Sequence, residues 1–149
     1  MFMRLLLLVT VANLSILGCS GVPPRHLGLK EGRLIPCPST PNCVSSQSTD
    51  PRHAVAPLPL RSAGYDAVLQ LKKIVIEMPR TRIVEEQGLY LRAEFRSALF
   101  RFVDDVEFFP DETAGIIHVR SASRVGRSDF GVNRERIEEI RIRWDAISK

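Results

Sequence analysis

The chain has 149 residues, of which 44% are apolar and 26% are charged, a composition typical of one globular domain with a single core. Its 21 basic and 17 acidic residues give a net charge of +4, with the two signs interleaved along the chain. These values exclude a disordered tail and a multi-span membrane protein, and they give no basic stripe of the kind a nucleic-acid-binding protein needs.

The first 18 residues predict a lipoprotein signal peptide. Arg4 precedes an apolar run over residues 5–17, which is too short to cross a bilayer that needs about 20 residues. The run leads into Ile-Leu-Gly-Cys at residues 16–19, which resembles a bacterial lipobox, where the chain is cut before a cysteine that is then acylated. We therefore expect lipidation at Cys19. The alternative is an ordinary signal peptide, or an uncleaved anchor, with this cysteine incidental.

Lipidation of Cys19 predicts a protein of the cell envelope that is held on a membrane by its lipid anchor. Several acyl chains anchor a protein stably where one does not. Ser20 follows the cysteine, which favours sorting to the outer membrane of Gram-negative bacteria, with the domain facing the periplasm. Cleavage removes Arg4, so 20 basic residues face 17 acidic ones and the mature net charge is +3. The sequence indicates no protein partner or small ligand by name.

Residues 19–33 predict a lipidated tether, and residues 34–149 a single globular domain. Eight of the ten prolines lie between Pro23 and Pro59, so we expect residues 20–60 to be mostly irregular, with little core of their own.

Cys37 and Cys43 are two thiols six positions apart in an exported chain, which favours a structural disulfide. The alternatives are a redox pair or a metal site with His53. Five intervening residues fit neither well, because redox pairs usually have two and zinc pairs two to four. We expect no metal and no cofactor.

Hydrophobic periodicity predicts a helix that begins after Ser62 as its N-cap and ends at Pro79. Alternation of apolar and polar residues then predicts strands over residues 81–85, 89–96, 100–109 and 115–121. A last helix carries Ile137, Ile140, Trp144 and Ile147 on one face. We expect an α+β fold: an antiparallel sheet of about four strands with two helices packed on one face, preceded by an irregular disulfide-containing segment.

The segment that joins the last strand to the last helix is rich in arginine. Asn133 is a candidate helix N-cap, with Val132 and Ile137 at the spacing of a hydrophobic staple. A helix start near several arginines resembles an anion pocket for phosphate or carboxylate. The alternative, which we favour, is a structural network in which these arginines pair with Glu107 and other carboxylates. The candidate network comprises Arg120, Arg124, Asp129, Asn133, Arg134, Asp104 and Asp105.

Three separated motifs resemble one family. They are CPSTPNCVSS at residues 37–46, DDVEF at 104–108 and RSASRVGRSDFGVNR at 120–134. Together they make the chain, over residues 34–147, similar to the family catalogued as domain of unknown function 1499. The resemblance implies one compact domain and transfers no catalytic residue. Family members often carry an aromatic residue where this chain has Arg127.

Catalysis is the less favoured interpretation. His26, His53 and His118 are the available imidazole bases for a serine nucleophile, and no nucleophile elbow, phosphate loop or zinc-protease motif is present. Asp104 and Asp105 do not predict an acid–base pair, because neighbours on a strand point to opposite faces. We expect a lipid-anchored envelope domain with a binding or structural role. An anionic-ligand binder using residues 120–134 is the first alternative, and a hydrolase the second.

Overall fold

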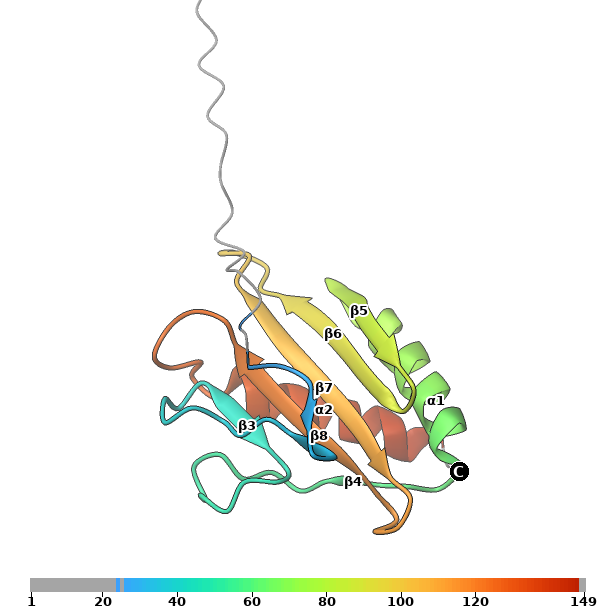
Figure 1. Cartoon of the computed structure of the whole chain (residues 1–149). Helices are drawn as coiled ribbons and strands as arrows, with labels where there is room; N and C mark the ends of the chain where they lie inside the picture. The colour runs from blue at the N-terminus through green and yellow to red at the C-terminus, as the bar shows by residue number, and fades with distance from the viewer. Residues whose placement is uncertain (1–23, 25, 148–149) are drawn as a thin grey trace, which may run out of the picture.

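The computed structural model of the protein describes residue 24 and residues 26–147 (Figure 1). The predicted signal peptide and the lipidation site at Cys19 lie outside the described residues. No helix in the part of the chain that the structure describes is long and apolar enough to cross a bilayer.

A six-stranded antiparallel sheet forms the centre of the fold (Figure 1). Its path runs β3-β8-β7-β6-β5, and β4 pairs with β8 beyond that path. The strands are β3 (Cys43–Ser45), β4 (Leu58–Pro59), β5 (Thr81–Gln87), β6 (Tyr90–Arg96), β7 (Val103–Asp111) and β8 (Ile116–Ser123). The long central strands thus follow one another as hairpins, as the alternating patterns predicted.

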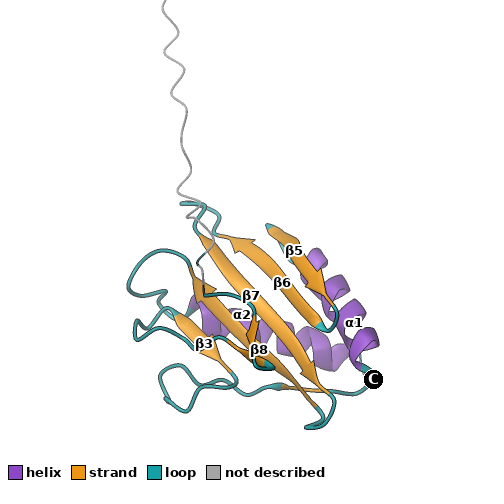
Figure 2. Cartoon of the chain, in the orientation of Figure 1, coloured by secondary structure: helices purple, strands orange, loops and turns teal. Residues whose placement is uncertain are grey.

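Two helices, α1 (Gly64–Glu77) and α2 (Val132–Ala146), cover one face of the sheet (Figure 2). They pack on the inward side chains of the central strands, among them Val106 and Phe108. Burying each such side chain contributes roughly 1.5–3 kcal/mol. The helix residues in this core are Ala67, Val68, Leu71, Ile74, Val75, Ile137, Ile140 and Trp144. The predicted α+β class and the two helices are confirmed.

The start of α1 differs from the prediction. Ser62 is not its N-cap: the cap position is Ala63, which makes no side-chain cap hydrogen bond. The carboxylate of Glu112, in the turn after β7, accepts a hydrogen bond from the Gly64 N–H instead (2.8 Å). The end of the helix is as predicted, because Pro79 disfavours a helical conformation at Met78, which is extended.

The number of strands also differs from the expected four. Residues 20–60, expected to be irregular, contribute β3 and β4, and they place Val44, Val55 and Leu58 in the core. Strands of two or three residues are too short to show the alternation on which the prediction depends. The expected disulfide is present: Cys37 and Cys43 are joined, and the second half-cystine begins β3.

A two-stranded hairpin, β1 (Leu29–Lys30) and β2 (Arg33–Leu34), lies on the sheet face away from the helices (Figure 1). Its Leu34 is buried, and the Leu34 N–H donates to Gln47 Oε1 (2.9 Å). The Gly28 N–H donates to the buried Glu107 (2.7 Å). Part of the segment expected as a tether is therefore ordered and covers the second face of the sheet.

Candidate functional site

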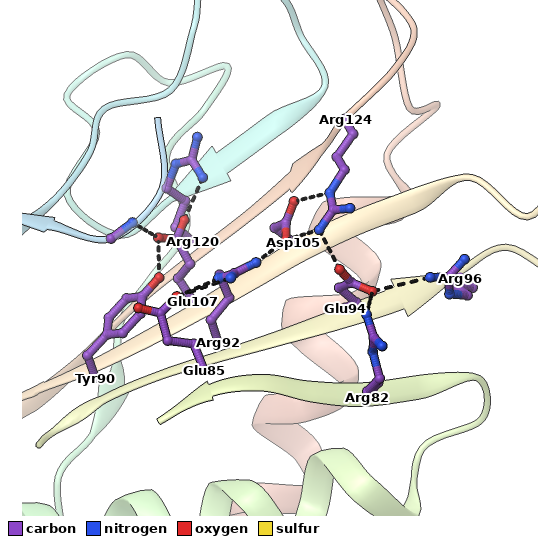
Figure 3. A network of polar contacts seen from close by, with 11 residues as sticks. Arg82, Glu85, Tyr90, Arg92, Glu94, Arg96, Asp105, Glu107, Arg120 and Arg124 are labelled. Carbon is purple, nitrogen blue, oxygen red and sulfur yellow. Dashed lines mark hydrogen bonds and ion pairs between the residues drawn. The ribbon is translucent and has the colours of Figure 1, made fainter. Parts of the chain in front are cut away.

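The sheet face under the β1–β2 hairpin is lined by charged residues. Strand alternation produces it, because the central strands place most of their apolar residues toward the helices and most of their charged residues away from them. The register aligns Glu94 with Asp105 across β6 and β7, and Glu107 with Arg120 across β7 and β8. The charged face comprises Arg82, Glu85, Tyr90, Arg92, Glu94, Arg96, Asp105, Glu107, Arg120 and Arg124 (Figure 3).

Glu107 is fully buried at one end of this face. Its Oε2 accepts a hydrogen bond from Arg120 Nη1 (2.6 Å), and its Oε1 accepts one from the Tyr90 hydroxyl (2.8 Å) as well as the Gly28 N–H (Figure 3). Burial, followed by the neighbouring Glu107 carboxylate, raises the pKa of the Tyr90 hydroxyl. The hydroxyl therefore stays protonated and acts as a donor.

Arg124 binds two carboxylates at the other end of the face. Its Nε and Nη2 donate to the two oxygens of Asp105 (2.7 and 2.8 Å), and Nη2 also donates to Glu94 (2.6 Å). The hydrogen bonds with Asp105 are the main cause of the raised pKa of Arg124. All three side chains are at most 5% exposed, so this is a buried ion-pair cluster rather than a surface contact.

Glu94 connects Arg124 to the edge of the sheet. Its Oε2 accepts hydrogen bonds from Arg82 (2.9 Å) and Arg96 (3.3 Å). Burial opposes ionisation of this carboxyl group, but hydrogen bonds from Arg124 and Arg82 more than offset that effect and lower the pKa of Glu94. Glu94 is therefore an anion shared by three arginines.

A cavity of about 500 Å³ lies beside the two buried arginines. Arg120 and Arg124 line it from the sheet, together with residues of the N-terminal segment, the disulfide loop and the end of β8. The other lining residues are Pro24, His26, Ile35, Pro36, Pro38, Thr40, Asn42, Ala122, Ser123 and Gly126. An arginine-lined cavity on the sheet face is the feature expected of the ligand-binding alternative.

The two arginines at this cavity differ in how fully they are paired. Arg120 is 3% exposed, and among the described residues its guanidinium makes one hydrogen bond, from Nη1 to Glu107. Its buried Nε has no hydrogen-bond partner within the part of the chain that the structure describes. A guanidinium carries five N–H donors, so Arg120 retains donors that the described protein groups do not bind.

The remaining members of the predicted network lie elsewhere. Asp104 points to the helix face of β7, where it pairs with Arg136 of α2. Asn133 does not cap α2: its buried amide accepts from Ser121 and Arg136 and donates to Ser123 and to the Asn42 carbonyl. Side chains of opposite strand faces cannot meet, so the predicted set divides into separate clusters.

Asp129 and Arg134 have structural partners of their own. Asp129 accepts hydrogen bonds from the Gly131 N–H (3.1 Å) and the Asn133 N–H (2.9 Å) at the start of α2. Asp129, rather than Asn133, thus satisfies free amides there. Arg134 donates to two backbone carbonyls, those of Ala54 and Arg52. The N-cap of α2 is Gly131, so Val132 is the first helical residue and does not precede the cap, and the expected hydrophobic staple is absent.

The hydrolase alternative has one contact of its own. Ser46 Oγ lies 3.3 Å from His118 Nδ1, and His118 Nε2 lies 3.8 Å from Asp111. Burial lowers the pKa of His118, which favours the neutral imidazole that can accept a proton. However, the Val119 N–H donates to Ser46 Oγ itself, and neither Ser46 nor His118 lines the arginine cavity.

Glu94, Arg92 and Tyr90 were not predicted as partners in the charged face. Their alternation with Leu91, Ala93 and Phe95 was visible in the sequence and would have placed them on one side of a strand. Their pairing with Arg124 and Glu107 depends on strand register, which the alternation does not fix.

The fold and the site define a small α+β domain with one apolar, helix-covered sheet face and one charged, hairpin-covered face. The family model described as "Protein of unknown function (DUF1499)" matches residues 33–143, and the chain belongs to this family. Searches of curated proteins and of solved structures gave no match.

Proposed function

We propose that this protein is a lipid-anchored domain of the cell envelope that binds a small ligand bearing a carboxylate or phosphate group. The observation that carries the proposal is Arg120, a buried cation beside a cavity, with guanidinium donors that the described protein groups leave unbound. The ILGC motif at residues 16–19 supports the anchor.

The charge of the sheet face supports an anionic group. The face holds the five arginines 82, 92, 96, 120 and 124, against the four carboxylates of Glu85, Glu94, Asp105 and Glu107. One positive charge therefore remains unbalanced within this set. A ligand oxygen in the cavity would accept hydrogen bonds from guanidinium donors of Arg120 that Glu107 leaves unbound.

The walls of the cavity support a ligand with an apolar body. Pro24, Ile35, Pro36 and Pro38 lie among the lining residues, and the cavity volume of about 500 Å³ falls in the range of small-molecule sites. Arg124 already binds Asp105 and Glu94. We therefore assign recognition of the ligand to Arg120 and a structural role to Arg124.

Thermal unfolding with defined probes tests the proposal. Octanoate carries a carboxylate on an apolar chain, inorganic phosphate supplies the anion alone, and octanol supplies the chain alone. We expect octanoate or phosphate to raise the melting temperature of the wild-type protein while octanol does not. Native mass spectrometry of protein purified from its own envelope then looks for a retained ligand.

Arg120→Gln should abolish the anion-induced rise in melting temperature. Arg134→Gln, which removes an arginine outside the cavity, should preserve that rise. Because Arg120→Gln leaves Glu107 buried without its cation, the double variant Arg120→Gln with Glu107→Gln keeps the measurement possible if the single variant is too unstable. A wild-type protein that neither anion stabilises, or a rise that survives in both Arg120 variants, contradicts the proposed site.

A hydrolase is the second candidate function, because Ser46 lies within hydrogen-bond distance of His118. An active-site-directed fluorophosphonate, with peptide mapping, tests it directly. We expect no modification of Ser46, because its hydroxyl oxygen is occupied by the Val119 N–H. Covalent labelling that Ser46→Ala and His118→Ala both remove would make the hydrolase the better interpretation.

A further inference from the structure

The loop between β6 and β7, residues 97–102, carries exposed apolar side chains. Leu99 is 79% exposed, Phe100 63% and Phe102 41%. The rings of Phe100 and Phe102 stack with their centroids 5.5 Å apart. Two hydrogen bonds between Ser97 and Phe102 close the loop, which lies at one end of the sheet (Figure 1). Clustered exposed apolar groups of this kind mark interaction surfaces.

Four arginines lie beside this loop. Arg80, Arg82, Arg96 and Arg101 line a hollow of about 320 Å³, with Thr81, Ser97 and Ala98 as its other lining residues. No carboxylate is among these lining residues. Glu94 accepts hydrogen bonds from Arg82 and Arg96, and it is also bound by Arg124. The hollow therefore has an excess of positive charge, and guanidinium groups match phosphate oxygens in geometry as well as charge.

An apolar tip next to a basic hollow fits the boundary between lipid headgroups and acyl chains. Aromatic and leucine side chains enter the acyl boundary, while arginines remain at the level of the phosphates. Attraction to anionic lipid falls off within a Debye length, so such arginines must lie close to the membrane surface. Loop and hollow adjoin each other at Ser97 and Ala98, so one orientation brings both to the membrane.

The same end of the sheet is where the described chain begins. Pro24 lines the cavity with Arg124, whose backbone N–H donates to the Val103 carbonyl directly after the loop (3.1 Å). Pro24 lies five residue steps after Cys19, and a fully extended chain spans at most about 3.6 Å per residue. A lipid on Cys19 therefore holds Pro24 within about 18 Å of the membrane.

We propose that the loop of residues 97–102 and the four arginines 80, 82, 96 and 101 dock the domain on an anionic phospholipid surface. Leu99 and Phe100 enter the acyl boundary, and the arginine hollow binds the phosphate of a lipid headgroup. The orientation of the domain toward the membrane rests on the lipid anchor of the proposed function, whereas the apolar loop and the arginine hollow are features of the structure itself.

Nitroxide labels on the full mature protein in vesicles test the docking. A label at Leu99→Cys is compared with one at Ile142→Cys, an exposed apolar position on α2. In vesicles that contain phosphatidylglycerol, we expect the label at 99 to collide with oxygen and to be shielded from a water-soluble nickel chelate. The label at 142 should stay accessible to the chelate. Two labels that are equally accessible to the chelate overturn the proposal.

Vesicle flotation separates docking from anchoring. If the protein carries no lipid, the proposed anchor fails, and flotation of the same chain with phosphatidylglycerol vesicles then tests docking alone. We expect Arg80→Gln with Arg101→Gln to weaken binding by about fivefold per arginine, and Lys73→Gln, an exposed charge on α1, to weaken it far less. If the double arginine variant and Lys73→Gln weaken vesicle binding equally, the arginine hollow does not bind the lipid phosphate. A water-exposed label at 99, together with a phosphate-induced rise in melting temperature that Arg80→Gln with Arg101→Gln removes and Arg120→Gln leaves intact, would identify a free-phosphate site in the hollow instead and overturn the docking.

Discussion

Asp104 and Asp105 are adjacent in the chain, yet their carboxylates lie on opposite faces of β7 and pair with different arginines. Asp104 binds Arg136 of α2, and Asp105 binds Arg124 after β8. The alternation of side chains along a strand produces this separation. One dipeptide therefore ties the sheet to a helix on one side and joins the buried charge network on the other.

Arg124→Ala should lower the free energy of unfolding by at most about 3–5 kcal/mol, because Asp105 then keeps only Arg92, and Glu94 only Arg82 and Arg96, as cations. That is a large part of the about 5–15 kcal/mol of a typical domain. Urea unfolding measures the loss, and Arg127→Ala, an exposed position in the same segment, should have little effect. A neutral Arg124→Ala that also loses stabilisation by added anions would show that Arg124 serves ligand binding rather than structure.

Asp129→Ala should lower the free energy of unfolding by about 1 kcal/mol at neutral pH, since it removes the acceptor for two amides at the start of α2. Asp145→Ala, an exposed surface pair with Arg61, is the matched control and should change stability little.

The Asp129 contribution should also depend on pH. Burial alone would raise the pKa of Asp129, but hydrogen bonds from the Asn133 and Gly131 amides outweigh it and hold the pKa below the ordinary value of 3.8. A carboxyl group with a depressed pKa stabilises the fold fully above its unfolded pKa and loses that contribution as the pH falls through the folded pKa. The difference between wild type and Asp129→Ala should therefore shrink below about pH 4. A difference that stays constant to lower pH would exclude the ionised side chain as its source.

The sequence was sufficient to predict the two helices, the central strands and the disulfide, because long periodic segments and two cysteines close together in the sequence are strong signals. It was insufficient for β3 and β4, whose two or three residues carry no period. The Glu112 contact with Gly64 joins positions 48 residues apart, and no local pattern indicates it. The partners of Arg120 and Arg124 were predicted only in part, since strand register decides which carboxylates they meet.

Cys19→Ser should release the protein into the soluble fraction or leave the precursor uncut. The reason is that a serine hydroxyl does not replace the thiol to which the proposed anchor would attach its diacylglycerol. Membrane fractionation and intact mass of the mature chain measure the change, and Ser20→Ala, which retains the thiol, is the control for cleavage. Unchanged size and unchanged fractionation of Cys19→Ser would exclude the anchor.

The disulfide between Cys37 and Cys43 should stabilise the domain by roughly 2 kcal/mol, the value that loop-closure entropy gives for so small a ring. Its loop also holds Asn42, whose side chain donates to the Gly126 carbonyl (2.8 Å) and whose own carbonyl accepts from Asn133. Replacing both cysteines by alanine should therefore lower the free energy of unfolding by that amount and speed amide hydrogen exchange in residues 36–43.

Peptide mapping of wild-type protein without reduction should find the two cysteines linked. Two freely alkylated thiols in protein taken from an oxidising compartment would count decisively against the bond, and a cysteine-free variant as stable as wild type would show that the bond does not stabilise the domain.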